Sequence, residues 1–262
     1  MSILHAIVLG IVQGLTEFLP VSSSAHLMWV PAQLHWPLPS LAFDLVLHMG
    51  TLLALLIYFR AELWTLFLTL IGQNKKTTLE SKWLWPLIVA TIPAVVLGLL
   101  FKDTFEAMFS DIRSVGIQLI MTAALLLIAE LIAKYYQKTR PFNLKNSIFI
   151  GLMQALAIIP GISRSGSTVA GGLMAGVDKK SAARFSFILA IPAIGGATLL
   201  KFKEILHMSA NGDLLAIVLG FVFSFLFGIL AIHYFIKLVQ KWPLWIYSIY
   251  CFVLGVWIWF RF

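Results

Sequence analysis

The sequence predicts an all-α integral membrane protein that forms a single membrane domain over residues 1–262. Hydrophobic residues make up 60% of the chain and charged residues only 11%, whereas soluble domains carry about 25% charged residues. A chain this apolar cannot hide its hydrophobic surface from water inside one globular core, so the lipid bilayer is the solvent that suits it. Six long apolar segments, and two shorter polar segments that resemble each other, predict how the domain is arranged.

The six long segments can each cross a bilayer as a helix, because about 18 or more apolar residues are enough to span its hydrocarbon core. They cover residues 41–59, 84–101, 114–133, 183–200, 214–236 and 243–260.

The basic residues predict the orientation of these spans. If the N-terminus lies outside and residues 1–34 enter the membrane and return, thirteen of the 19 Lys and Arg residues fall in cytoplasmic loops and five on the outer side. Cytoplasmic loops normally carry such an excess. Basic residues spread over short loops do not form the stripe of a nucleic-acid-binding surface, so we expect no nucleic-acid partner. Arg164 is the one basic residue in neither group.

The two shorter segments are too polar and too interrupted to be ordinary spans. They are GIVQGLTEFLPVSSSAH at residues 10–26 and GLMQALAIIPGISRSGST at residues 151–168. Each contains a glycine, a glutamine three positions later, a proline and a serine-rich tip, which indicates a duplication. The matched positions are Gly10 with Gly151, Gln13 with Gln154, and Pro20 with Pro160.

The duplication predicts an inverted-topology repeat with six transmembrane helices and two re-entrant broken-helix pairs. Proline removes a backbone donor and clashes with the preceding turn, so both short helices should break at their prolines. The first repeat, about residues 1–135, holds a re-entrant pair and three spans, so the second, about residues 146–262, must run upside down. Broken helices of such repeats meet near the middle of the membrane, where irregular backbone must be buried or line a cavity. We therefore expect the two tips to meet from opposite faces.

Glu17 and Gln13 are the first candidate site residues. A charged side chain at the membrane centre costs about 2.5 kcal/mol or more, so intramembrane carboxylates generally mark function. Gln13 lies four residues before Glu17, on the same helical face. Gln13 either serves the site or forms a hydrogen bond between helices, and the sequence leaves both open.

A serine-rich tip, Ser22, Ser23 and Ser24, follows Pro20 and precedes His26. A helix that starts here can take a serine as its N-cap, and its free N–H groups and partial positive charge suit phosphate oxygens. The serines therefore either bind phosphate or only cap the helix. His26 favours chemistry, because imidazole titrates near neutral pH and can act as acid, base or phosphoryl acceptor.

Arg164 lies in the second tip, within PGISRSGST, where no loop accommodates it. A buried guanidinium needs an anionic partner, and its fork matches a phosphate bidentately. Gly166 permits close backbone approach, and Ser165 can cap the helix that follows. The alternative is a structural ion pair between Arg164 and Glu17, which would not explain the hydroxyl groups around it.

Asp44 and His48 share a helical face near the start of the first long span. Asp44 either supports the residues of the site or binds a metal ion, or it has no role in function. We expect His48 to be structural. Cys251 is the only cysteine, so the chain has no disulfide framework and no cysteine-based metal site.

Three motifs resemble those of the undecaprenyl-diphosphate phosphatases, the bacitracin-resistance family. They are EFLPVSSSAH at 17–26, FDLVLHMGT at 43–51 and PGISRSG at 160–166, and the resemblance extends over essentially the whole chain. It implies a multi-pass enzyme of the bacterial plasma membrane that removes the terminal phosphate from the C55 polyprenyl diphosphate. The product is the undecaprenyl phosphate carrier for cell-wall polymers. The resemblance further implies a divalent cation, Mg²⁺ or Ca²⁺, and an active site open to the extracytoplasmic side.

Carried over by position, the family's acidic motif corresponds to Gln13 and Glu17, with Glu17 as a metal ligand. Its hydroxyl and histidine correspond to Ser23 and His26, and its arginine to Arg164. The family often has glutamate where this chain has Gln13, which cannot ionise. The expected catalytic residues are Glu17, Ser23, His26 and Arg164, and the expected substrate-binding residues are Gln13, Ser22, Ser24, Ser163, Ser165 and Gly166.

Three mechanisms remain open: attack by Ser23, attack by His26, or activation of water by His26. A secondary transporter or lipid carrier is the main alternative function, because inverted repeats with broken helices are typical of transporters. The Ser/His/Glu/Arg cluster favours phosphoryl chemistry, since a carrier needs no nucleophile. A scaffold or receptor would leave the intramembrane ionisable residues unexplained. A homodimer is compatible with the sequence, although no motif specifies one.

Overall fold

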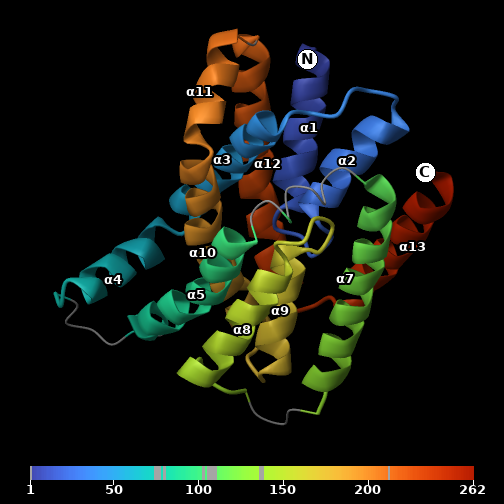
Figure 1. Ribbon diagram of the computed structural model, residues 1–262. Coiled ribbons are helices and arrows are strands. Elements are labelled where there is room, and N and C mark those ends of the chain that lie inside the picture. Colours follow the sequence, from blue (N-terminus) through green and yellow to red (C-terminus); the bar gives the residue numbers. More distant parts are fainter. Residues whose placement is uncertain are drawn as a thin grey trace.

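Helices form all the regular secondary structure in the computed structural model, which describes residues 2–73, 78, 81–101, 104, 111–135, 139–211 and 213–262 (Figure 1). In chain order they are α1 Ile3–Thr16, α2 Ser23–Gln33, α3 Leu41–Tyr58, α4 Arg60–Leu70, η1 Ser81–Trp83, α5 Leu84–Leu100, α7 Ile112–Ala133, α8 Leu144–Leu156, α9 Arg164–Met174, α10 Lys179–Leu200, α11 Phe202–Asn211, α12 Leu214–Leu238 and α13 Trp245–Arg261.

Five of the described helices are long and apolar enough to cross a membrane: α3, α5 with η1, α7, α10 and α12. The sixth predicted span, residues 243–260, forms α13, which has only 17 residues. At 1.5 Å per residue this helix is about 26 Å long, shorter than a hydrocarbon core of about 30 Å. Within the described residues, five of the six predicted spans are therefore long enough to cross a membrane. The helices α4 and α11 were not predicted from the sequence.

The two short helices that open the two halves of the chain each pack against one long helix. A Cβ atom on Gly10 of α1 would lie 2.5 Å from the backbone oxygen of Gly220 in α12. Likewise, a Cβ atom on Gly151 of α8 would lie 2.6 Å from the backbone oxygen of Ala90 in α5. Small residues let membrane helices approach this closely. These close contacts hold α1 and α8 in place just before the chain breaks at Pro20 and Pro160.

Substituting Gly10 with alanine should therefore loosen the contact between α1 and α12. The added methyl group overpacks a helix crossing with no free space, and such changes cost about 1–3 kcal/mol. Thermal unfolding in detergent should show a clearly lower Tm for Gly10→Ala. The matched control is Gly195→Ala in α10, where no atom lies within 4 Å of an added Cβ. Equal Tm values for the two variants would contradict this account of the crossing.

Two ion pairs join helix ends at one side of the bundle. Lys179 Nζ lies 2.9 Å from Glu130 Oε1, and Arg184 lies 2.6 Å from Glu62. The other carboxylate oxygen of Glu130 accepts a hydrogen bond of 2.9 Å from the backbone N–H of Leu244. This side of the bundle carries basic residues predicted to face the cytoplasm. Other basic residues used in that prediction, Lys75, Lys76, Lys102 and Lys138, lie outside the described residues.

Buried aromatic side chains pack directly behind Glu17 in the chain. Phe18 follows Glu17 directly and is fully buried. Its ring meets Phe187 of α10 edge-on, with 5.2 Å between centroids, and Phe187 in turn contacts Phe59 and Phe235. Buried aromatic pairs of this kind hold their neighbours firmly, so the backbone of Glu17 rests on a rigid core.

Candidate active site

The site lies where the two broken helices meet. In Figure 1, α1 begins at the top of the molecule and α8 at the bottom, and each stops partway through it. Ser165 donates a hydrogen bond of 2.9 Å to the carbonyl of Leu19, and the N–H of Gly161 donates one of 3.1 Å to Ser24 Oγ. The prediction that the two tips lie together is confirmed.

A serine caps the helix that follows each break. Ser22, at a φ of +69°, accepts a hydrogen bond from the N–H of Ala25 at the start of α2. Ser163 accepts one of 3.0 Å from the N–H of Gly166 at the start of α9. The prediction of Ser165 as the second cap is wrong, because the cap is Ser163, two residues earlier, and the helix begins at Arg164. Residues at both helix starts line one cavity, to which they present partial positive charge.

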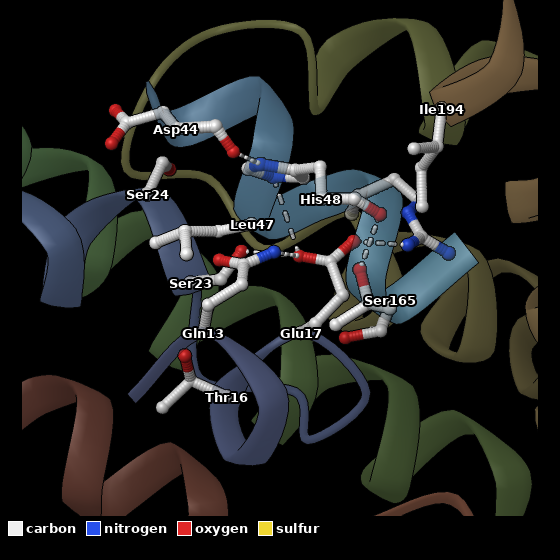
Figure 2. Close-up of polar contacts among 12 residues, drawn as sticks. Gln13, Thr16, Glu17, Ser23, Ser24, Asp44, Leu47, His48, Ser165 and Ile194 are labelled. Carbon is white, nitrogen blue, oxygen red and sulfur yellow. Dashed lines mark hydrogen bonds and ion pairs between the residues drawn. The ribbon is translucent and has the colours of Figure 1, made fainter. Parts of the chain in front are cut away.

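Glu17 is the centre of the hydrogen-bond network (Figure 2). Its Oε2 accepts hydrogen bonds from Ser23 Oγ at 2.6 Å and from Gln13 Nε2 at 2.9 Å. Its Oε1 accepts a hydrogen bond of 2.5 Å from a guanidinium nitrogen of Arg164. Glu17 and Gln13 are both buried. The structure therefore brings together four of the predicted residues. Three come from the first broken segment, residues 10–26, and one comes from the second, residues 151–168.

Arg164 forms the ion pair with Glu17 that the sequence offered as the alternative to an anion site. The two interpretations are compatible, because Arg164 also lines the cavity beside Glu17. Its second guanidinium nitrogen lies 3.5 Å from the carbonyl of Ser186, a long hydrogen bond. An anion that enters the cavity therefore meets a guanidinium group that is already hydrogen-bonded to the carboxylate of Glu17.

His48 belongs to the site, contrary to the expectation that it is structural. Its Nε2 lies 3.5 Å from Glu17 Oε2, and its Nδ1 lies 2.7 Å from the carbonyl of Asp44. The carbonyl fixes the direction of the ring, because only a protonated nitrogen can donate to it. When protonated, His48 adds a second cation next to the Glu17 carboxylate.

His26, by contrast, has its hydrogen-bond partners elsewhere. Its Nδ1 lies 2.7 Å from the carbonyl of Ser22, and its Nε2 lies 2.6 Å from the hydroxyl of Tyr250 in α13. A neutral ring that donates to the carbonyl accepts from this hydroxyl, and the two rings are also stacked. His26 does not belong to the cavity lining. The hydrogen bonds of His26 are thus to Ser22 and Tyr250, so its catalytic role stays a prediction, and Tyr250 is a contact that the motifs did not reveal.

Several buried polar atoms around the cavity have no hydrogen-bond partner among the described residues. They include Gln13 Oε1, Asp44 Oδ1 and both amide atoms of Gln154. Figure 2 shows the Asp44 carboxylate directed away from Glu17. Buried polar groups in native proteins are nearly always paired, so these atoms indicate a place for a polar ligand.

The cavity itself has a volume of about 720 Å³, within the range of about 300–1,000 Å³ typical of ligand sites. Its polar end is formed by Glu17, Ser22, Ser23, Ser24, Asp44, His48, Gln154, Ser163 and Arg164. This end combines a hydroxyl bound to a carboxylate with a guanidinium and two helix N-termini. Such a set can hold an anion and direct a nucleophile at it.

The chain matches a family model described as bacitracin resistance protein BacA over residues 6–257. It is 42% identical over 268 residues to an undecaprenyl-diphosphatase of Methanobrevibacter smithii, with 98% of this chain and 96% of that protein aligned. It is 40% identical over 265 residues to an undecaprenyl-diphosphatase of Alteromonas mediterranea, with 100% of both chains aligned.

Proposed function

Because the chain belongs to the family of the bacitracin resistance protein BacA, we propose that it is an undecaprenyl-diphosphatase whose active site is divided between the two tips. It is a membrane hydrolase that releases the terminal phosphate of undecaprenyl diphosphate and regenerates undecaprenyl phosphate. One observation carries the assignment of the site: Ser23 and Arg164, from opposite tips, bind the two oxygens of the same buried carboxylate, Glu17.

Binding begins with an exchange of partners. The diphosphate enters between the tips, where Arg164 and the N-termini of α2 and α9 meet its oxygens. Arg164 then turns from Glu17 to phosphate, which its planar fork can hold bidentately. This exchange leaves Glu17 Oε1 without its cation and leaves Ser23 hydrogen-bonded to Oε2. Substrate binding therefore prepares the carboxylate that the reaction uses.

The geometry favours Ser23 as the nucleophile. Its Oγ forms a bond to the terminal phosphorus, the bond from that phosphorus to the bridging oxygen breaks, and the hydroxyl proton passes to Glu17. Undecaprenyl phosphate leaves with the electron pair of the broken bond. Water then attacks the phosphorus of phosphoserine as the bond from phosphorus to Ser23 Oγ breaks. Glu17 returns its proton to Oγ, and the proton that the water loses leaves on the released inorganic phosphate. His26 is held between Ser22 and Tyr250, so a direct attack by His26 would first break that bond with Tyr250.

A divalent cation, Mg²⁺ or Ca²⁺, fits the polar end of the cavity. No group of three or more His, Cys, Asp or Glu side chains is placed to hold a metal within the described residues. Glu17 and the unpaired Gln13 Oε1 are oxygen donors, however, and Mg²⁺ is often held by one or two carboxylates together with substrate phosphates. When bound, the cation would offset the charge of the diphosphate.

Helix packing supports an inverted repeat. The α1–α12 pair runs parallel, because Gly10 meets Gly220 and Gly14 meets Ser224. The α8–α5 pair is also parallel, because Gly151 meets Ala90 while Ile158 lies nearest to Gly98. These two matched contacts support the proposed repeats, about residues 1–135 and 146–262, in which α5 corresponds to α12 and α7 would correspond to α13. We place the protein in the bacterial plasma membrane with the site open to the extracytoplasmic side.

Phosphate release by the purified protein in detergent tests the proposed function. Undecaprenyl diphosphate should yield one inorganic phosphate per molecule together with undecaprenyl phosphate. Counterflow of a labelled solute without phosphate release would instead support a transporter. The transporter is not favoured here, because it does not explain a serine hydrogen-bonded to an intramembrane carboxylate.

Ser23→Ala should reduce phosphate release by about 1,000-fold or more, as loss of a catalytic nucleophile does. Acid quenching with substrate labelled in the terminal phosphate should label the unsubstituted protein but not this variant. Ser224→Ala is the matched control, because that hydroxyl donates only to the carbonyl of Leu47, away from the cavity lining. A label that persists in Ser23→Ala and disappears in His26→Ala would assign the nucleophile to His26.

A further inference from the structure

The polar side chains of the cavity beside Glu17 gather mainly at one end. Apart from Thr91 and Lys201, its remaining wall is apolar and comes mainly from α5 and α10, including Ala94, Val95 and Leu99 of α5 and Ile194, Ala197 and Leu199 of α10. A diphosphate gains nothing from such a wall, whereas a hydrocarbon chain buries its surface there. The cavity therefore joins a site for charge to a site for hydrocarbon.

The apolar wall reaches the outer surface of the helix bundle. Leu99 and Leu199 line the cavity, yet their exposed fractions are 55% and 77%. Val95 and Leu200 likewise line the cavity and are exposed. In a membrane protein, exposed leucine and valine on spanning helices face lipid. The cavity thus opens sideways, between α5 and α10, toward the hydrocarbon of the membrane.

Two glycines in this wall have no packing role that explains them. An added Cβ on Gly98 would meet only the end of Ile158, at 3.5 Å, and one on Gly196 would meet no atom within 4 Å. This contrasts with Gly10 and Gly151, where a Cβ would strike backbone. Glycine within a helix costs about 1 kcal/mol relative to alanine, and here no packing contact requires it. Gly98 and Gly196 therefore keep space open along the cavity wall.

Gln154 independently indicates a ligand in the same cavity. It is only 2% exposed, and neither of its amide atoms has a hydrogen-bond partner among the described residues. An unpaired buried amide is costly, and a phosphate oxygen would satisfy its N–H group. Gln154 lines the cavity together with Arg164 and Gly98, so one molecule can present phosphate to the polar residues and hydrocarbon to the glycines.

We propose that the polyprenyl tail of the substrate passes out of the cavity between α5 and α10, along Gly98 and Gly196, while Gln154 binds its diphosphate. This inference rests on the proposed function and identifies which part of the substrate each wall recognises. A cavity of about 720 Å³ holds a ligand of drug size, and an undecaprenyl chain is much larger. Most of the tail must therefore remain in the lipid, and the glycines let it cross the wall.

The test compares undecaprenyl diphosphate with farnesyl diphosphate, whose tail is short, as substrates in detergent. Gly196→Phe should lower the ratio of the two kcat/KM values, long over short, by about tenfold or more, because a steric clash discriminates between substrates at this scale. Gly195→Phe is the matched control, since Gly195 is equally uncrowded but does not line the cavity. It should leave the ratio unchanged.

Gly98→Leu is a second variant on the opposite wall and should lower the same ratio, so the test survives if Gly196→Phe fails to fold. An unchanged ratio in folded Gly196→Phe and Gly98→Leu would overturn the proposed exit, as would an equal fall in Gly195→Phe. Absence of phosphate release from both substrates by the unsubstituted protein would instead reject the proposed function.

Discussion

Replacing Arg164 with alanine should lower kcat/KM for phosphate release from undecaprenyl diphosphate by about 1,000-fold or more, because arginines that stabilise a transferring phosphoryl group contribute about 10³–10⁵ to the rate. Arg164 is the guanidinium from the second tip that reaches Glu17 at 2.5 Å and lines the cavity. Without it, the terminal phosphate loses the guanidinium that binds it, and the buried carboxylate oxygen Glu17 Oε1 loses its cationic partner. Assays of phosphate release across substrate concentrations would measure the loss.

Two comparisons separate this effect from simple damage to the fold. Arg164→Lys should recover only a small part of the activity, since lysine keeps the charge but lacks the planar fork. Arg184→Ala removes an arginine that is also partly buried and paired with a glutamate, Glu62, at 2.6 Å, but lies outside the cavity lining. It should lower Tm and spare kcat/KM. Near-normal phosphate release by Arg164→Ala would refute the role given to this residue.

Replacing Glu17 with glutamine should have an effect of similar size, about 100- to 10,000-fold, which is the usual contribution of a positioned proton acceptor. Glutamine has nearly the shape of glutamate but cannot take the proton of Ser23 or pair with Arg164. Phosphate release and acid-quench labelling should both fall, because the step that forms phosphoserine is the one affected. Restoring normal rates by raising the substrate concentration alone would contradict this, since it would indicate a defect in binding only.

Glu130→Gln provides the matched control for Glu17→Gln. Glu130 is also a buried carboxylate with a cationic partner, Lys179, and a backbone donor, Leu244. It lies near the C-terminal end of α7, beside the first residue of α10, and outside the cavity lining. Breaking a buried pair is destabilising, so this variant should unfold at lower temperature while its kcat/KM stays near that of the unsubstituted protein.

The sequence predicted the residues of the site better than their orientations. Glu17, Ser23 and Arg164 stand out because each is polar within an apolar segment, and the matched motifs predicted that their tips lie together. The direction of His26 could not be predicted, because its partner Tyr250 lies 224 residues away on the last helix. His48 was underrated for the same reason: α3 brings it to Glu17, and no local pattern records that packing.

For the fold as well, features set by local sequence were predicted, whereas features set by tertiary packing were not. Apolar length predicted α3, α5, α7, α10 and α12 well, because spanning a bilayer constrains the sequence directly. The last segment has the same composition but forms a helix of 17 residues, so length and not hydrophobicity separates it from the others. The sequence identified Gln154 only as the counterpart of Gln13. That its amide is buried and unpaired beside the cavity depends on the tertiary structure.

A double-mutant cycle on Glu17 and Arg164 tests most directly whether the two tips form one active site. The measurement is kcat/KM for phosphate release from undecaprenyl diphosphate by the unsubstituted protein, Glu17→Gln, Arg164→Ala and the double variant, with each protein shown to be folded by its Tm. Residues that act as one catalytic unit are strongly non-additive, so the double variant should lose about as much activity as the more impaired single variant. A loss equal to the product of the two single losses would show that Glu17 and Arg164 act independently, and would contradict the divided site.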